Sequence, residues 1–407
     1  MKCRCCGSHL EQTFLDLGSS PPSNAYLSAA ELAGPEVWYP LQVMVCGDCR
    51  LVQTREFTRA EDLFTEDYAY FSGFSTSWVE HCRRYVDEMV DRLGLGPDSL
   101  VVEVACNDGT LLAKFRDRGI RCLGIEPSTS TASAARELGL EVVEEFVGVD
   151  MAERLAAEGI AADLLVANNV VAHVPDIVDF VRGCGFLLSR DGVASFEFPY
   201  LLRLVRGVQF DTIYHEHFSY LSLTSLSRVV DAAGLVICDV GEIPTHGGSL
   251  RVYLRRADGS HPVLLAVQAV LDAEVEAGIG RDEFYNGFQA KADRVKDDLL
   301  QFLLEARANG RRVAAYGAAA KGNTLLNYAG IRPDLVPFAV DRNPAKQGKF
   351  LPGSRIPIVD EGKLIEAQPE HVLVLPWNIW PELSESLAYV REWGGSFVMA
   401  VPELQIV

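Results

Sequence analysis

The sequence is short of basic residues and has no long apolar run. It holds 56 Asp and Glu against 37 Lys and Arg, a formal net charge of −19. Nucleic acid and anionic membranes would therefore repel it. No apolar stretch reaches the roughly 20 residues that a bilayer-spanning helix needs, and the start, MKCRCCGSHL, lacks the apolar core of a signal peptide. We expect a cytoplasmic monomer without nucleic-acid or membrane partners, although a phosphorylated small ligand needs only a local basic pocket.

Cysteine is abundant at one end of the chain. Five of the ten cysteines lie within the first 49 residues. Cys3 and Cys6, and Cys46 and Cys49, form two C-x2-C pairs whose four thiolates can surround one tetrahedral zinc ion. Four thiolates leave no open position for a substrate, so the predicted zinc is structural. A redox dithiol is the alternative, and Cys5 is a spare thiol next to the first pair.

Four consecutive residues concentrate titratable side chains: Tyr214, His215, Glu216 and His217. Two imidazoles, a carboxylate and a phenol can take a proton from carbon and stabilise the charge left behind. In an extended segment, Tyr214 and Glu216 would point to one face and the two histidines to the other. A metal-binding H-x-H pair, a polar loop, and buried histidines satisfied by backbone carbonyls are the alternatives.

A chain of 407 residues exceeds one ordinary hydrophobic core, so two or three domains are expected. The central part has the pattern of a doubly wound α/β domain. Apolar residues recur at helical spacing from Trp78 to Leu93, with Gly94 placed to end the helix. Apolar strands are predicted at 100–105, 122–126, 162–167 and 193–198. A glycine-bearing turn and a helix follow the first strand, and ligands bind beyond the carboxyl ends of such strands.

The turn after the first strand indicates the kind of ligand. It is not G-x-G-x-x-G: it has one glycine and a polar Asn-Asp pair, which suits a cationic amino acid better than a pyrophosphate. Glu126, at the end of the second strand, is spaced to bind a ribose diol. The candidate cofactor-binding residues here are Glu103, Ala105, Asn107, Gly109, Glu126, Pro127, Asn168 and Asn169. An acid after the second strand also serves NAD, so an NAD-dependent nucleotide-sugar epimerase or reductase stays an alternative.

Two later segments could bind an anion. The run from Thr245 to Arg251, THGGSLR, can offer backbone N–H groups and a guanidinium to phosphate before a strand at 252–255; an ordinary hairpin turn is the alternative. A long helix at 284–304, ended by Gly310, leads to a second α/β pattern with strands at 313–316, 337–341 and 372–376. Its first turn is rich in small residues and carries Lys321, as expected for nucleotide binding. A domain kept for packing or dimerisation is the alternative.

Several of these motifs together resemble a known family over essentially the whole chain. The zinc pairs, the run from Tyr68 to Trp78, EVACNDGT, YHEH, THGGSLR and YGAAAKGN are similar to the zinc-containing, S-adenosylmethionine-dependent sugar C-methyltransferases of antibiotic deoxysugar biosynthesis, of the tetronitrose C-3′ type. The resemblance implies an α/β chain with a zinc-binding module at 1–65, a Rossmann-like methyltransferase domain at 66–265, a helical connection at 266–310 and a second Rossmann-like domain at 311–407. Its implied cofactors are S-adenosylmethionine and structural zinc.

The same resemblance implies a substrate and a set of roles. The substrate would be a dTDP-linked 4-keto-6-deoxyhexose, methylated at C-3′ through an enolate, with C-5′ left open. His217 would be the base, with Tyr214, Glu216, Tyr68 and His173 in the catalytic site and Tyr70 and Ser72 at the methyl donor. Substrate-binding positions would be His246, Gly247, Ser249, Arg251, Lys321, Asn323, Asp341 and Asn378. A non-catalytic nucleotide-sugar-binding or assembly protein is the remaining alternative.

Overall fold

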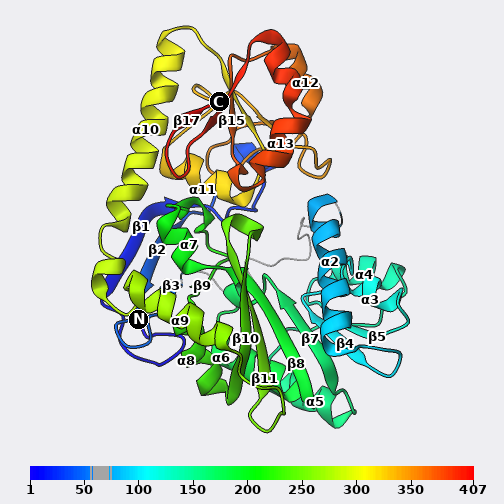
Figure 1. Ribbon diagram of the computed structural model, residues 1–407. Helices are drawn as coiled ribbons and strands as arrows, with labels where there is room; N and C mark the ends of the chain where they lie inside the picture. Colours follow the sequence, from blue (N-terminus) through cyan, green and yellow to red (C-terminus); the bar gives the residue numbers. More distant parts are fainter. Residues whose placement is uncertain (56, 58–72, 74–75) are drawn as a thin grey trace.

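The computed structural model describes residues 1–55, 57, 73 and 76–407, arranged around three sheets (Figure 1). Tyr68, Tyr70 and Ser72, expected near the reaction centre, lie outside the described residues. Within the described part of the chain, no helix is both long and apolar enough to cross a membrane. The cytoplasmic location and the monomeric state stay predictions.

The first sheet is antiparallel and belongs largely to the N-terminal module. Its order is β1 (Gln12–Ser20), β2 (Tyr39–Val45), β3 (Val52–Thr54) and β9 (Ser219–Tyr220). The fourth strand comes from far along the chain, directly after His217 and Phe218, and pairs Tyr220 with Val52. The predicted boundary at residue 65 therefore does not separate this sheet from the central part of the chain.

The central sheet has seven strands in the order β10-β11-β8-β7-β4-β5-β6. The parallel strands are β4 (Leu100–Val104), β5 (Arg121–Ile125), β6 (Val142–Val143), β7 (Ala162–Asn168) and β8 (Leu188–Pro199). β11 (Ser249–Arg256) runs antiparallel to both β8 and β10 (Leu235–Ile243). The predicted strands are confirmed, and β8 begins five residues earlier than its apolar run.

Helices cover both faces of this sheet, as the buried residues of β4 show. Val101 packs in a cluster with α2 (Thr76–Leu93) and α3 (Leu112–Arg116), and Ala135 of α4 (Thr129–Glu137) belongs to the same cluster. Leu100, Val102 and Val104 pack in the other cluster with α5 (Val149–Ala157), α6 (Ile177–Leu187) and α8 (Leu223–Ala233). This two-sided burial is typical of a doubly wound α/β domain.

The C-terminal sheet has the order β14-β13-β12-β15-β16-β17. All its neighbouring strands are parallel except β17 (Gln405–Ile406), and they are β12 (Val313–Tyr316), β13 (Ala339–Val340), β14 (Ile358–Val359), β15 (His371–Val374) and β16 (Ser396–Met399). Its helices are α11 (Ala320–Tyr328), α12 (Glu361–Ala367) and α13 (Trp380–Ser386). The second α/β pattern read from the sequence is therefore a folded unit.

The helical connection is more than a spacer. It comprises α9 (Leu265–Ala277) and α10 (Phe288–Ala308), and α10 runs along the edge that joins the lower and upper parts of the molecule (Figure 1). Phe288 of α10 stacks on Phe14 of β1 with ring centroids 4.6 Å apart. The N-terminal sheet, α10 and the C-terminal sheet share one hydrophobic cluster. The helix begins at Phe288 rather than Phe284 because Gly287 has a φ of +79° at its N-cap.

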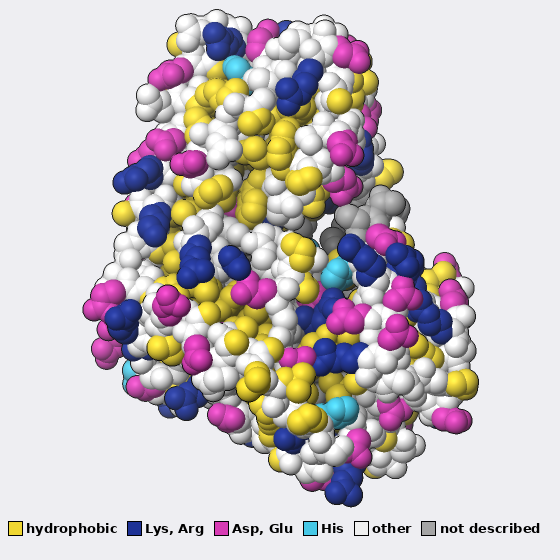
Figure 2. All heavy atoms as spheres, in the orientation of Figure 1, with side chains coloured by type: hydrophobic (Ala, Val, Ile, Leu, Met, Phe, Trp, Pro, Cys, Tyr) yellow, Lys and Arg dark blue, Asp and Glu magenta, His cyan; other side chains and the backbone are white. Residues whose placement is uncertain are grey.

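The remaining short helix, α7 (Leu201–Arg206), follows β8 and leads toward the YHEH run. In the orientation of Figure 1, the molecular surface is hollowed where the C-terminal unit meets the central unit (Figure 2). Over the rest of this face, acidic and basic side chains are scattered among hydrophobic and neutral ones. The junction between the two units is therefore a candidate position for a functional site.

The turn after β4 gives a prediction about stability. Gly109 has a φ of +77°, and a Cβ there would lie 2.4 Å from Cδ1 of buried Leu140. Gly119 has nearly the same φ, +78°, but a Cβ would meet nothing within 4 Å. Gly119→Ala should cost about 1–2 kcal/mol from backbone strain alone, and Gly109→Ala about 1–2 kcal/mol more because Leu140 must move. Urea unfolding of both variants measures the difference; equal losses would contradict the steric argument.

Candidate active site

The zinc pairs converge as the sequence predicts. The Sγ atoms of Cys3, Cys6, Cys46 and Cys49 all lie within 4.8 Å of one another, with Cys3 3.4 Å from Cys49 and Cys6 3.5 Å from Cys46. Thiolates around a tetrahedral zinc lie about 3.8 Å apart, given Zn–S bonds of about 2.3 Å. The side-chain amide of Gln53 also donates to the Cys3 sulfur at 3.2 Å. The donor set fits a structural zinc ion, and the four predicted ligands converge on one point.

The zinc module holds the backbone of the YHEH run. Arg4, beside Cys3, donates from Nη1 to the carbonyls of Thr54 at 2.7 Å and Phe218 at 3.3 Å. The Thr54 hydroxyl donates to the carbonyl of His217 at 3.2 Å. With the β3–β9 pairing, these bonds fix the chain on the C-terminal side of His217.

The YHEH run is a turn, so the alternation of side chains that an extended segment would have does not apply to it. The backbone N–H of His217 donates to the Tyr214 carbonyl at 3.0 Å, which closes the turn. Tyr214 and His217 consequently lie on the same side, with ring centroids 4.1 Å apart. A turn reverses the chain, whereas side chains alternate only along an extended strand.

Backbone hydrogen bonding sets the protonation of His217. Its Nδ1 lies 3.0 Å from the carbonyl oxygen of Thr212, which can only accept, so the neutral ring carries its proton on Nδ1. Nε2 is then the basic nitrogen. Burial, with the neighbouring His173 and Lys321, holds the pKa of His217 well below 6.5. At neutral pH the imidazole is an uncharged base.

His173 lies edge-on to His217, with ring centroids 4.5 Å apart. Its Nδ1 donates to the carbonyl of Glu216 at 2.8 Å. Burial lowers the pKa of His173 to about 4. His173 is therefore also neutral, with its single ring proton already given to the backbone.

The other two residues of the run face the N-terminal module. The Glu216 carboxylate accepts from the backbone N–H of Asn24 at 3.3 Å and from its side-chain amide at 3.2 Å, and burial raises the pKa of Glu216. His215 donates from Nε2 to the Tyr39 carbonyl at 3.3 Å. Both side chains dock the run onto the zinc module.

The predicted donor-binding residues gather at the carboxyl ends of β4, β5 and β7. Ala105, Asn107 and Gly109 have φ values of +51°, +53° and +77°, which bend the chain sharply after β4. Glu126 accepts from the backbone N–H groups of Asn107 and Ser128, both at 3.0 Å, and burial raises its pKa. Glu126 therefore ties the first two strand ends together, and Pro127 follows it directly.

Two side chains of this region have buried polar atoms that could bind a ligand. Within the described residues, Oε2 of Glu103 and both side-chain polar atoms of Asn168 are buried and have no hydrogen-bond partner. Buried polar groups normally have partners, so these atoms fit a polar ligand such as S-adenosylmethionine. Asn169, in a left-handed conformation with φ +56°, donates to Nε2 of His246 at 3.4 Å and joins this region to the THGGSLR segment.

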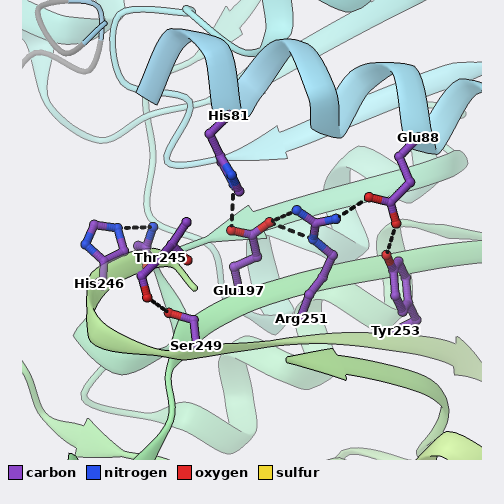
Figure 3. A network of polar contacts seen from close by, with 9 residues as sticks. His81, Glu88, Glu197, Thr245, His246, Ser249, Arg251 and Tyr253 are labelled. Carbon is purple, nitrogen blue, oxygen red and sulfur yellow. Dashed lines mark hydrogen bonds and ion pairs between the residues drawn. The ribbon is translucent and has the colours of Figure 1, made fainter. Parts of the chain in front are cut away.

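A polar network that the sequence analysis missed lies under α2 (Figure 3). Glu197 of β8 is buried and accepts from Arg251 Nε at 2.7 Å, and its other oxygen lies 3.0 Å from Nε2 of His81. These partners hold the pKa of Glu197 below its ordinary value in spite of burial. Glu88 binds the far side of Arg251 at 2.6 Å. The sequence signal for this network was a charged residue, Glu197, within the apolar strand predicted at 193–198.

This network corrects the phosphate-binding role expected for Arg251. All three guanidinium nitrogens face carboxylates of Glu197 and Glu88, so the charge of Arg251 is already neutralised. Ser249 donates to the carbonyl of Thr245 at 2.9 Å, which stabilises the loop. Gly247, with φ +88°, lies against Trp377 of the C-terminal unit, where a Cβ would come within 2.8 Å of the ring. The THGGSLR segment thus builds the junction between the two units.

The predicted C-terminal residues have three different roles: Lys321 and Asn378 bond to each other, Asn323 contacts the N-terminal module, and Asp341 organises its own unit. Lys321 donates from Nζ to Oδ1 of Asn378 at 2.6 Å. Asn323 is buried and donates to the Ser23 carbonyl at 2.6 Å, so it docks the N-terminal module rather than a substrate. Asp341 accepts from the backbone N–H groups of Ala318 and Asn343, both at 2.8 Å, and so shapes the turn after β12.

Removing zinc should loosen the YHEH run, because the module fixes the backbone of His217 and Phe218. We expect one zinc per chain, and after chelation faster amide hydrogen exchange across residues 214–220. Exchange in β15 serves as the internal control and should not change. Adding zinc back should restore the protection of residues 214–220 from amide exchange. Unchanged exchange at 214–220 in zinc-free protein would show that the run is held independently.

Comparison with known proteins agrees with this layout. Three family models match in order: "Putative zinc binding domain" at residues 3–64, "Methyltransferase domain" at 78–240 and "C-methyltransferase C-terminal domain" at 244–402. The C-methyltransferase NovU of Streptomyces niveus is 36% identical over 406 residues, which cover 100% of this chain and 96% of NovU.

More distant matches cover the methyltransferase part. A ubiquinone biosynthesis O-methyltransferase of Methylobacterium sp. (strain 4-46) is 28% identical over 37% of this chain and 67% of its own. Among solved structures, magnesium protoporphyrin IX methyltransferase from Synechocystis PCC 6803 matches with a TM-score of 0.35 and 16% identity, over 44% of this chain and 85% of that one. A TM-score this low is too weak to support a conclusion about this chain.

The full-length match to NovU sets aside the NAD-dependent and non-catalytic alternatives. It extends through the zinc module, the donor-binding fold and the second α/β unit, the combination on which the resemblance rested. The chain belongs to the family of zinc-binding, S-adenosylmethionine-dependent C-methyltransferases.

Proposed function

We propose that this C-methyltransferase acts on a dTDP-linked 4-keto-6-deoxyhexose and methylates C-3′ after His217 removes the proton there. The observation that carries the proposal is the hydrogen bond from His217 Nδ1 to the Thr212 carbonyl, 3.0 Å long. It leaves Nε2 as a buried basic nitrogen. Zinc has its own four thiolates, so His217 is not needed as a metal ligand.

A carbon next to a ketone fits these residues. Such a carbon becomes nucleophilic only after it loses a proton, and the proton is removable when the enolate oxygen is stabilised as it forms. Nε2 of His217 takes the proton from C-3′, and the electron pair moves onto the 4-keto oxygen. S-adenosylmethionine, when bound, supplies an electrophilic methyl group on a sulfonium. Tyr214, whose ring lies 4.1 Å from that of His217, is placed to orient the sugar.

The position of the methyl group rests on the resemblance to C-3′ enzymes. Both neighbours of a 4-ketone, C-3′ and C-5′, carry acidic protons, so methylation at C-5′ would use the same base and the same enolate oxygen. NMR of the product separates the two. The nucleotide end of the substrate would lie toward the C-terminal unit, at the carboxyl ends of β12, β13 and β15, where such folds bind ligands.

His217→Asn should abolish turnover while leaving S-adenosylmethionine bound. The amide of Asn can still donate to the Thr212 carbonyl but has no basic nitrogen, so methyl transfer should fall by about 10²–10⁴-fold. The assay follows methyl transfer by mass over a panel of dTDP-4-keto-6-deoxysugars. His215→Asn is the matched control and should retain most of the activity, because His215 donates to the Tyr39 carbonyl on the side of the N-terminal module. Normal turnover in His217→Asn would eliminate His217 as the base.

The pH dependence of the wild type should report the lowered pKa of His217. Neutral imidazole is the active form, so kcat/KM should hold its plateau as pH falls through 6.5 and decline only at lower pH, as the ring gains a proton. A pH–rate profile measures this, with refolding to neutral pH as a check for denaturation. An acidic limb at or above pH 6.5 would contradict the assignment of a buried neutral base.

A further inference from the structure

The C-terminal unit is docked onto the backbone that leads into the YHEH run. Thr324 of α11 donates from its hydroxyl to the carbonyl of Ile213 at 2.9 Å. Trp377 donates from its indole N–H to Oδ2 of Asp211 at 2.7 Å. The two acceptors, Ile213 and Asp211, lie within three residues of Tyr214 in the sequence. The start of α11 therefore lies beside the proposed reaction centre.

Lys321 stands at this start of α11, three residues before Thr324. Residues three apart lie on the same face of a helix, so Lys321 shares the face that Thr324 turns to the Ile213 carbonyl. Its ammonium donates to Asn378 at 2.6 Å and lies 4.9 Å from the centre of the Trp377 ring. Two neighbours thus fix the direction of the side chain.

Lys321 forms no ion pair among the described residues. Among the described residues, no carboxylate oxygen lies within 4 Å of its ammonium, in contrast to Arg251. Asp211 is the nearby acid: burial raises its pKa to about 6, the charge of Lys321 opposes that rise, and its Oδ2 accepts from Trp377. The positive charge of Lys321 lowers the pKa of both His217 and His246. Because Trp377 contacts both Lys321 and Asp211, three residues before Tyr214, an anion bound beside this segment would be attracted to Lys321.

The proposed reaction creates such an anion. When C-3′ loses its proton to His217, a full negative charge develops on the C-4′ oxygen. His173 cannot carry it, because its ring is neutral and its one proton is bonded to the Glu216 carbonyl. A phenol such as Tyr214 can donate a hydrogen bond but brings no charge. An ammonium in a water-poor site meets the requirement more strongly than a neutral donor.

We propose that Lys321 is a catalytic residue: its ammonium binds the C-4′ oxygen of the sugar and stabilises the enolate, while Asn378 and Trp377 aim it. The proton goes from C-3′ to Nε2 of His217, the C–H electron pair forms the C-3′–C-4′ double bond, and the carbonyl pair moves to the oxygen facing Lys321. The double-bond electrons then take the methyl group, and the sulfonium leaves as a thioether. This inference rests on the proposed function and gives Lys321 a role other than phosphate binding.

The test measures enolate formation separately from binding. With the methyl donor replaced by S-adenosylhomocysteine, the wild type should exchange the C-3′ hydrogen of a dTDP-4-keto-6-deoxysugar with deuterated solvent. Lys321→Met should slow both exchange and methyl transfer by about 10²–10³-fold, with the dissociation constant for the dTDP-sugar changed less than about threefold. Lys321→Arg should recover part of both rates, because it keeps the charge.

Lys296→Met is the matched control. Lys296 also lies over an aromatic ring, 5.0 Å from the centre of Tyr328, but it is on α10 and pairs with Asp293 and Asp297. Its variant should keep wild-type exchange. Thermal unfolding and S-adenosylmethionine binding confirm that Lys321→Met is folded. In Lys321→Met the acidic limb of the pH–rate profile should also shift to higher pH, because a charge that lowers the pKa of His217 is gone.

Three outcomes decide against the inference, and they are distinguishable. Wild-type exchange in Lys321→Met, together with a large loss of dTDP-sugar affinity, would return Lys321 to phosphate binding and leave the proposed function intact. Wild-type exchange with wild-type affinity would remove Lys321 from the site altogether. A wild-type protein that neither exchanges nor methylates any 4-keto sugar would refute the proposed function and the inference with it.

Discussion

The hydrogen bond between His217 Nδ1 and the Thr212 carbonyl is the constraint on which the site depends. A carbonyl oxygen has no proton to give, so one 3.0 Å contact decides which ring nitrogen is basic. Burial then keeps that nitrogen unprotonated at neutral pH. The protein therefore obtains an uncharged base from position and solvation, and a partner carboxylate is not needed.

Each of the three units holds a different part of the backbone around that bond. Ahead of the turn, the C-terminal unit binds the side-chain carboxylate of Asp211 and the backbone carbonyl of Ile213. The zinc module binds the His217 carbonyl and pairs with the strand behind the turn. The central unit contributes His173, which holds the Glu216 carbonyl within the turn. The proposed base thus sits where the three folded units meet, while the donor-binding turn after β4 belongs to the central unit alone.

The sequence predicted the elements well where local patterns determine them. Hydrophobic periodicity located α2, and apolar runs located most strands of both α/β units, although β6, β10, β14, β16 and β17 were not predicted; cysteine spacing brought out the four thiols that converge. The sequence left the conformation of YHEH open between an extended segment and a turn, because a turn closed by a backbone hydrogen bond leaves no periodic signal. The role of Arg251 was mispredicted: its partners Glu88 and Glu197 are distant in the sequence, and only the fold shows that they neutralise it. His81 was missed for the same reason, since its partner lies on another element.

The pairing of β3 with β9 has a consequence for how the chain folds during synthesis. The first three strands of the N-terminal sheet leave the ribosome early, but the strand that completes the sheet follows only after most of the central domain has been made. Contacts between distant segments form late and slowly. Until then the edge of β3 is exposed, and an open strand edge invites pairing with other chains. Zinc bound early by the four cysteines would hold the nascent module compact while its last strand is still being made.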